Sequence, residues 1–357
     1  MGKSEPKVIE EHALVLESPR PRRWWRRGLG YSLAAVCLYW VLRDLSLREL
    51  LHRVAEMDLF WVGAAILFDV LSYICQGLRW KLLLRPVGRI TVLGTTQAIY
   101  AGLFVNEMLP LKVGEIVRAF LVSRWTSVKL SSIVPSILLE RLFDGVWLAV
   151  GIVITIVFVP LPRRLVEGGD VFGVAILVAL ILVTVLAFGS RRPSSNDLTR
   201  KNKFITLLQS TSFELRVASK TRGALLAFVL SLLLLLLQGF SFWFVMRAYG
   251  LHLSFAMGLA VFIIVHLGTL IPTAPANVGS YQFFTVLGLT LFGIDKATAA
   301  GFSLVVFTVL TAPLWAIGLW ALGSSGLTLL EVRSELGRLL TPAKLRQLNQ
   351  QQERPRV

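Results

Sequence analysis

The 357-residue chain is 55% hydrophobic and only 16% charged, and its mean hydropathy is +0.69. A soluble globular domain of ordinary composition is less apolar, so the sequence predicts a polytopic membrane protein. The formal net charge of +16 does not indicate nucleic-acid binding. Its basic residues are scattered over loops between apolar runs, whereas a nucleic-acid surface gathers them on one folded face.

Metal, disulfide and nucleotide chemistry are not expected. Cys37 and Cys75 both lie in apolar runs, which is typical of small core residues. No pair among the four histidines has metal-ligand spacing, and the chain contains no Walker A segment. We therefore expect no metal, no cofactor and no ATP hydrolysis.

Apolar runs long enough to cross about 30 Å of hydrocarbon recur along the chain. The candidate spans are 24–42, 59–78, 133–160, 171–189, 223–246, 254–271 and 297–322, with 280–294 as a shorter piece. The sequence therefore predicts an all-α transmembrane bundle of about eight spans.

Basic residues gather in alternate loops. Lys and Arg number seven in 1–28, four in 79–89, eight in 191–222 and six in 331–357, together 25 of 37. By the positive-inside rule, both termini and the loop 190–222 are expected in the cytoplasm.

The same charge count divides the chain into three parts. A basic cytoplasmic tail, 1–28, precedes a transmembrane domain, 29–325, and a second cytoplasmic tail, 326–357, follows. The expected location is the cell (inner) membrane.

The segment 106–119, NEMLPLKVGEIVRA, is strongly polar between two apolar stretches. Pro110 and Gly114 interrupt its helical pattern, and broken backbone at membrane depth is tolerated only beside protein or a wet cavity. Since the predicted span 59–78 ends in the cytoplasm and the predicted span 133–160 starts there, residues 90–128 must enter the membrane and return. A re-entrant hairpin is favoured over two simple crossings.

A second interrupted segment, 267–289, has the same spacing of proline and glycine. Pro275 and Gly279 are four residues apart, as in the first segment, and a helix-like run follows each glycine. Matched interruptions in two halves indicate the substrate site of transporters built from repeats. They favour a second re-entrant segment and leave an inverted repeat open.

A third polar cluster, Glu140, Arg141 and Asp144, lies inside the apolar run 133–160. Their helical spacing lets the three side chains share one region of surface. Charges inside the membrane must be paired or face water, so the cluster is interpreted as the wall of a polar path. An inert ion pair near the cytoplasmic interface is the alternative.

These three blocks resemble the lysylphosphatidylglycerol synthetase transmembrane-region family, which includes the membrane half of the multiple peptide resistance factor. The resemblance covers roughly residues 30 to 325 and implies a flippase-like bundle with two re-entrant segments. The residues carried over by motif are Asn106, Pro110, Gly114, Glu115, Arg118, Glu140, Arg141, Asp144, Pro275, Asn277, Gly279 and Gln282. The aminoacyl-transferase domain of the resistance factor has no counterpart before Val357, so we expect no synthesis of lysyl-lipid.

The resulting functional prediction is a translocator, not an enzyme, that moves a polar phospholipid or glycolipid headgroup between leaflets. Its partners would be membrane lipids with anionic or zwitterionic headgroups, without nucleic acid. Arg118 and the helix after Gly114 would receive the phosphate, because the forked guanidinium matches its geometry. A non-transporting accessory subunit of a glycolipid or cell-envelope pathway is the alternative, and a second copy or an envelope-synthesis partner stays open.

Overall fold

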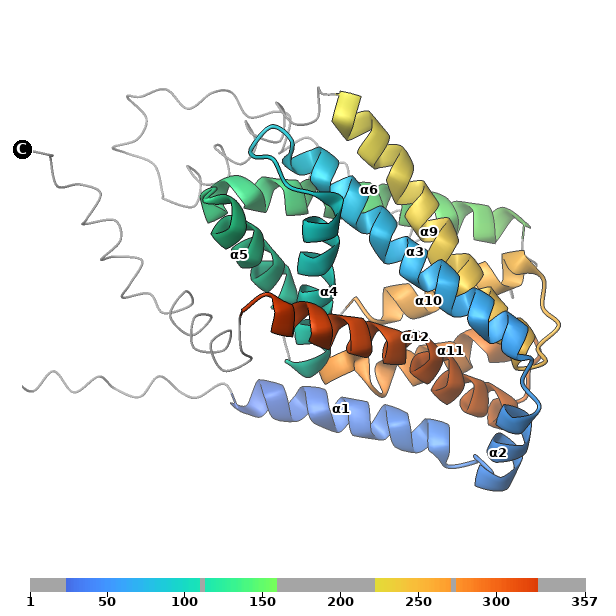
Figure 1. The fold of residues 1–357 in the computed structure, drawn as a ribbon. Helices are drawn as coiled ribbons and strands as arrows, with labels where there is room; N and C mark the ends of the chain where they lie inside the picture. The colour runs from blue at the N-terminus through green and yellow to red at the C-terminus, as the bar shows by residue number, and fades with distance from the viewer. Residues whose placement is uncertain (1–23, 110–112, 159–221, 271–273, 327–357) are drawn as a thin grey trace, which may run out of the picture.

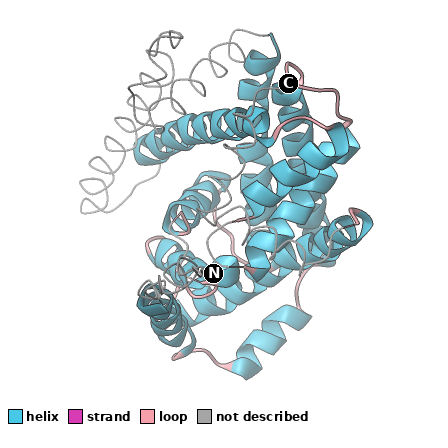
Figure 2. Cartoon of the chain, turned by 90° about the vertical axis from the view of Figure 1, so that its left-hand side faces the viewer, coloured by secondary structure: helices cyan, strands magenta, loops and turns pink. Residues whose placement is uncertain are grey.

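A computed structural model describes residues 24–109, 113–158, 222–270 and 274–326 of the chain. Every regular element within these ranges is a helix, as Figure 2 shows. The elements are α1 (Trp24–Leu42), α2 (Leu47–Ala55), α3 (Leu59–Leu84), α4 (Val92–Met108), α5 (Gly114–Thr126), α6 (Leu130–Phe158), α9 (Arg222–Ala248), α10 (Phe255–Gly268), the 3-10 turn η2 (Pro275–Asn277), α11 (Ser280–Thr290) and α12 (Lys296–Ser324). The predicted all-α bundle is confirmed.

Three of the described helices, α3, α9 and α12, are long and apolar enough to cross a membrane. They coincide with the predicted spans 59–78, 223–246 and 297–322. The predicted span 171–189 and most of the predicted tails and cytoplasmic loop lie outside the described residues. The number of spans and the re-entrant course of the hairpins stay predictions.

Helices α3 and α9 form an antiparallel pair and run side by side in Figure 1. The N–H of Asp58, which precedes α3, donates to the carbonyl of Ala248 at the end of α9, with N and O 3.4 Å apart. Further along, the hydroxyl of Ser241 donates to the carbonyl of Ala65 at 2.8 Å. Small side chains at this seam let the two backbones approach closely.

Each half of the bundle has the same order of elements. A long helix (α3 or α9) leads into a hairpin of two shorter helices (α4–α5 or α10–α11), and another long helix follows (α6 or α12). The two halves also exchange contacts, since α12 packs against α4 and α6 packs against α10. With α3 and α9 antiparallel, this is the packing pattern of an inverted repeat.

Polar caps explain where several helices begin. The side chains of Asp58, Thr91, Ser254 and Asp295 accept hydrogen bonds from the backbone N–H groups of the first turns of α3, α4, α10 and α12. Each cap satisfies a donor that the helix itself leaves unpaired. The breaks between consecutive apolar helices are therefore encoded locally.

We expect Asp295→Ala to lower the stability of the folded chain by about 1 kcal/mol, because the Asp295 carboxylate accepts the N–H of Thr298 at 2.8 Å. That hydrogen bond lowers the pKa of Asp295. The cap's contribution is thus full above the usual aspartate pKa and is lost as the pH falls through the lowered value of the folded state. The thermal midpoint measured against pH checks this. Asp295→Asn, which keeps a cap without a titrating group, should remove this part of the pH dependence.

Candidate functional site

A fully buried arginine, Arg79 on α3, stands at the centre of an ion network. Its guanidinium donates to the carboxylates of Glu140 and Asp144 on α6, with a 3.3 Å contact to Glu140, and to the hydroxyl of Ser231 on α9 at 2.8 Å. The network therefore ties three helices together, and it crosses from the first half of the bundle to the second.

Glu140 is shared between two arginines. Its second carboxylate oxygen accepts a 2.6 Å hydrogen bond from Arg118 on α5, whose side chain is only 4% exposed. The guanidinium of Arg118 also lies over the ring of Trp80, 4.7 Å from its centroid, and the indole N–H of Trp80 donates to Ser136 at 2.9 Å. Cation–π stacking and a buried carboxylate together hold Arg118 in place.

The predicted polar cluster on α6 has two sides. Glu140 is fully buried, whereas the Arg141 side chain is 50% exposed and pairs with Glu115 at 2.6 Å and with Asp144 at 3.6 Å. Three arginines, Arg79, Arg118 and Arg141, thus face the carboxylates of Glu115, Glu140 and Asp144. The formal charges of the six balance, which is what charges inside apolar helices require.

The predicted span 59–78 ends one residue before Arg79, which the charge count assigns to the basic loop 79–89. In the structure α3 continues to Leu84, so Arg79 lies within the helix and is buried. Glu140 and Asp144 in the apolar run 133–160 were the sequence signal for a buried arginine, because each buried acid needs a basic partner.

Asn106 and Gly114 of the first polar segment close the hairpin of α4 and α5. The side-chain oxygen of Asn106 accepts the backbone N–H of Gly114 at 2.6 Å. A Cβ atom on Gly102 would lie 2.6 Å from the carbonyl oxygen of Gly114, so the two helices meet backbone to backbone. Pro110 lies outside the described residues.

The second interrupted segment is held by its own backbone geometry. Ala276 and Asn277 have left-handed φ values of 54° and 51°, and Gly279 has a φ of 90°. The side-chain oxygen of Gln282 accepts the N–H of Gly279 at 2.7 Å and so caps α11. Pro275 begins the turn η2, which packs against α4, so the interrupted parts of the two halves meet.

A polar cavity of about 290 Å³ lies at this meeting point. Its walls come from α3, α4, α9, α10, η2, α11 and α12. The lining residues are Asp69, Tyr73, Glu107, Gln238, Phe262, His266, Thr269, Ala276, Asn277, Tyr281, Phe307, Leu310, Thr311 and Leu314. Of the site residues predicted from the sequence, Asn277 lines the cavity, whereas Arg118 lies in the ion network.

The two carboxylates of the cavity, Asp69 and Glu107, were not among the predicted site residues. Asp69 interrupts the apolar run 59–78, and an ionisable residue inside such a run is by itself a signal of function. Glu107 belongs to the polar segment 106–119. Only the fold shows that the two carboxylates line one space.

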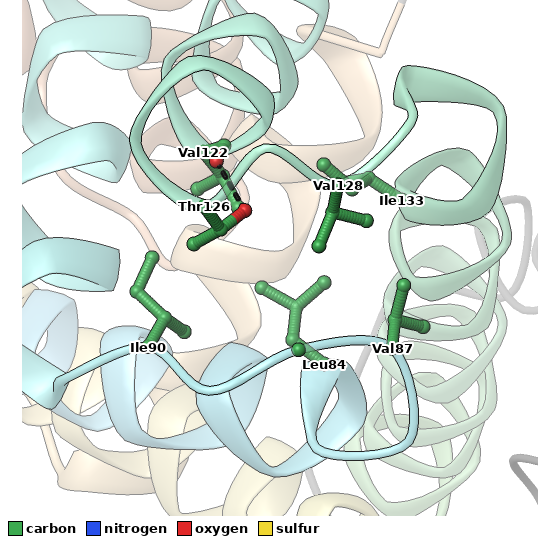
Figure 3. Close-up of a pocket in the computed structure, with 8 residues that line it drawn as sticks. Leu84, Val87, Ile90, Val122, Thr126, Val128 and Ile133 are labelled. Atoms are coloured by element: carbon green, nitrogen blue, oxygen red, sulfur yellow. Dashed lines mark hydrogen bonds between the residues drawn. The ribbon is translucent and has the colours of Figure 1, made fainter.

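A second, smaller pocket lies where the α3–α4 connection packs on the α5–α6 connection (Figure 3). Its volume of about 10 Å³ leaves room for roughly one water molecule. The hydroxyl of Thr126 donates to the carbonyl of Val122 in its own helix, and the other side chains around the pocket are aliphatic. This pocket offers no chemistry for a ligand.

Apolar helices of spanning length, arranged as two inverted halves around buried charges, define an integral membrane protein of the helical-bundle class. The chain belongs to the family described as Lysylphosphatidylglycerol synthase TM region, whose model matches residues 28–318. The family resemblance drawn from the three polar blocks is thereby confirmed.

Three relatives are similar to parts of this chain. The chain is 23% identical over 303 residues to a UPF0104 membrane protein of Methanothermobacter thermautotrophicus, covering 80% of this chain and 88% of the relative. It is 25% identical over 205 residues to the UPF0104 membrane protein MJ1078 of Methanocaldococcus jannaschii, covering 55% and 83%. A shorter match, 28% identical over 138 residues, covers 34% of this chain and 22% of the glycosyltransferase AglD of Haloferax volcanii.

Proposed function

We propose that the protein is a lipid translocator whose polar cavity receives the headgroup of a membrane lipid. The observation that supports this most directly is a polar cavity of about 290 Å³ among apolar helices, where the interrupted hairpins of the two halves meet. A headgroup that leaves water needs hydrogen-bonding partners along its path, and the acyl chains can stay in the hydrocarbon. The volume is near the lower end of the roughly 300–1,000 Å³ of ligand pockets, which suits a headgroup alone.

The residue roles in this proposal differ from those predicted for a phosphate held by Arg118. Arg118 already donates to Glu140 and stacks on Trp80, so binding a phosphate there would break a buried ion pair. We assign the ion network to holding the helices in register. The headgroup would instead contact Tyr73, Tyr281 and Asn277, which can donate and accept hydrogen bonds.

The chain would lie in the cell membrane with both termini in the cytoplasm, as the distribution of Lys and Arg indicates. Its partners would be lipids, and it would make or break no covalent bond.

Reconstitution tests the proposal. Purified protein in vesicles that contain fluorescent phosphatidylglycerol or phosphatidylethanolamine should let an external reductant bleach lipid from the inner leaflet faster than in protein-free vesicles. An accessory subunit would leave the bleaching rate of both lipids at the protein-free level.

Thr311→Phe should slow translocation about tenfold or more, because the ring would fill part of the cavity that Thr311 lines. Thr308→Phe is the matched control, since Thr308 lies one turn earlier on α12 and is exposed. The bleaching rate of both variants measures the difference. Equal rates for the two variants would show that lipid does not pass through this cavity.

A further inference from the structure

The cavity contains a buried carboxylate with an unpartnered oxygen. Asp69 is only 5% exposed, and its Oδ2 atom has no hydrogen-bond partner among the residues that the structure describes. A buried charged oxygen without a partner is costly, so such a group either loses its charge or binds a cation. Asp69 is one of the residues that line the cavity of about 290 Å³.

The surroundings of Asp69 favour positive charge. Glu107 lines the same cavity, and no lysine or arginine is found among its described lining residues. Two helices also end there, because α4 stops at Met108 and α10 stops at Gly268, next to lining residues. The carboxyl ends of helices carry partial negative charge and unpaired carbonyl groups, which in transporters with broken helices bind sodium ions or protons.

Groups that face Asp69 come from each neighbouring element. Tyr73 on α3 and Tyr281 on α11 line the cavity together with both carboxylates, and the ring of Tyr73 packs on that of Tyr100 on α4, with centroids 5.2 Å apart. The other polar groups around the cavity are Glu107 on α4, Gln238 on α9, His266 on α10, Thr269 after α10, Asn277 in η2 and Thr311 on α12. The Oδ1 atom of Asn277 is a second buried oxygen with no hydrogen-bond partner among the described residues.

We propose that Asp69 is the binding site of a monovalent coupling cation, a proton or a sodium ion, that enters the cavity during the transport cycle. The proposal rests on the translocator function proposed above and adds its source of energy. Binding of one cation neutralises the Asp69 carboxylate. The cation gradient across the membrane then biases which state of the cavity is populated.

Carbodiimide labelling tests the site without any transport measurement. Dicyclohexylcarbodiimide adds to protonated carboxyl groups in apolar surroundings, and peptide mass spectrometry locates the adduct. In sodium-free buffer, purified protein should be labelled at Asp69 at low pH. Labelling should fall by about tenfold per pH unit above the titration midpoint, because only the protonated form reacts.

Three variants show whether the carbodiimide adduct forms on Asp69 and which neighbouring carboxylate affects its titration. Asp69→Asn should lose the adduct. Glu107→Gln should move the midpoint of Asp69 labelling to lower pH, because a neighbouring negative charge favours the protonated form. Glu115→Gln, whose native side chain pairs with Arg141 outside the cavity, should leave the midpoint unchanged.

Added salts distinguish the two cations. If sodium reduces labelling at a fixed pH and equal potassium does not, sodium is the ligand, whereas indifference to both salts together with the pH dependence identifies the proton. Three outcomes would overturn the proposal. They are no Asp69 adduct at any pH, labelling of Asp69 that responds to neither pH nor sodium, and labelling of Asp69 that only added phosphatidylethanolamine reduces. Vesicles that move no lipid while Asp69 titrates as described would refute the translocator function and leave the cation site standing.

Discussion

Arg79→Ala should lower the stability of the folded protein by about 3–5 kcal/mol, the largest effect that we expect from removing a single side chain. Arg79 is fully buried and neutralises Glu140 and Asp144 together. Its loss leaves Asp144 with the half-exposed Arg141 and Glu140 with Arg118 alone. The thermal midpoint in detergent, together with the yield of monodisperse protein, measures the effect.

Arg141→Ala is the matched control for that experiment. It removes the same charge and a second partner of Asp144, but Arg141 pairs with Glu115 and not with Glu140, and its side chain is 50% exposed. Exposed ion pairs are worth roughly 0.2–1 kcal/mol, so this variant should stay close to the wild type. Equal losses from the two substitutions would mean that burial of Arg79 does not determine the strength of the network.

Gly114→Ala should also cost about 3 kcal/mol or more, although it adds only a methyl group. A Cβ atom at this position would overlap the carbonyl oxygen of Gly102 and lie 2.7 Å from the side-chain oxygen of Asn106. The obstacle is backbone, so α4 and α5 must move apart. The thermal midpoint should fall, and protease should cut the α4–α5 hairpin faster.

Gly63→Ala shows what the same change does without the contact. Gly63 lies inside α3, and no atom would come within 4 Å of an added Cβ. Alanine is the better helix former, so this variant should be stabilised by about 0.5–1 kcal/mol. If Gly114→Ala left the thermal midpoint unchanged, the close contact between Gly114 and Gly102 would not limit the stability of the α4–α5 hairpin.

Local signals were sufficient for much of the fold. Apolar runs located α3, α9 and α12, and the spacing from Pro275 to Gly279 pointed to the break before α11. Those features depend on composition and backbone geometry within one segment. The sequence could therefore predict the type of element and the places where helices are interrupted.

The partners of buried charges could not be predicted in the same way. Arg79 and Glu140 are separated by 61 residues, and Arg118 could equally pair with Glu115 on its own helix by spacing alone. In the fold, Glu115 pairs with Arg141, and Arg118 pairs with Glu140. Which of several nearby charges meet is decided by the packing of α5 against α6, and one-dimensional spacing does not contain that information.

The positions of the charged residues along the chain also bear on how the protein enters the membrane. Arg79, Arg118, Glu140 and Asp144 all belong to the half that is synthesised first, and only the neutral Ser231 comes from the later half. Chains emerge and fold from the N-terminal end, so these charges can neutralise one another while the ribosome is still making α9. The cavity is completed later, because its lining residues Asn277, Tyr281 and Thr311 are synthesised near the end of translation. Neutralisation of the buried charges in the first half thus requires no residue that lines the cavity.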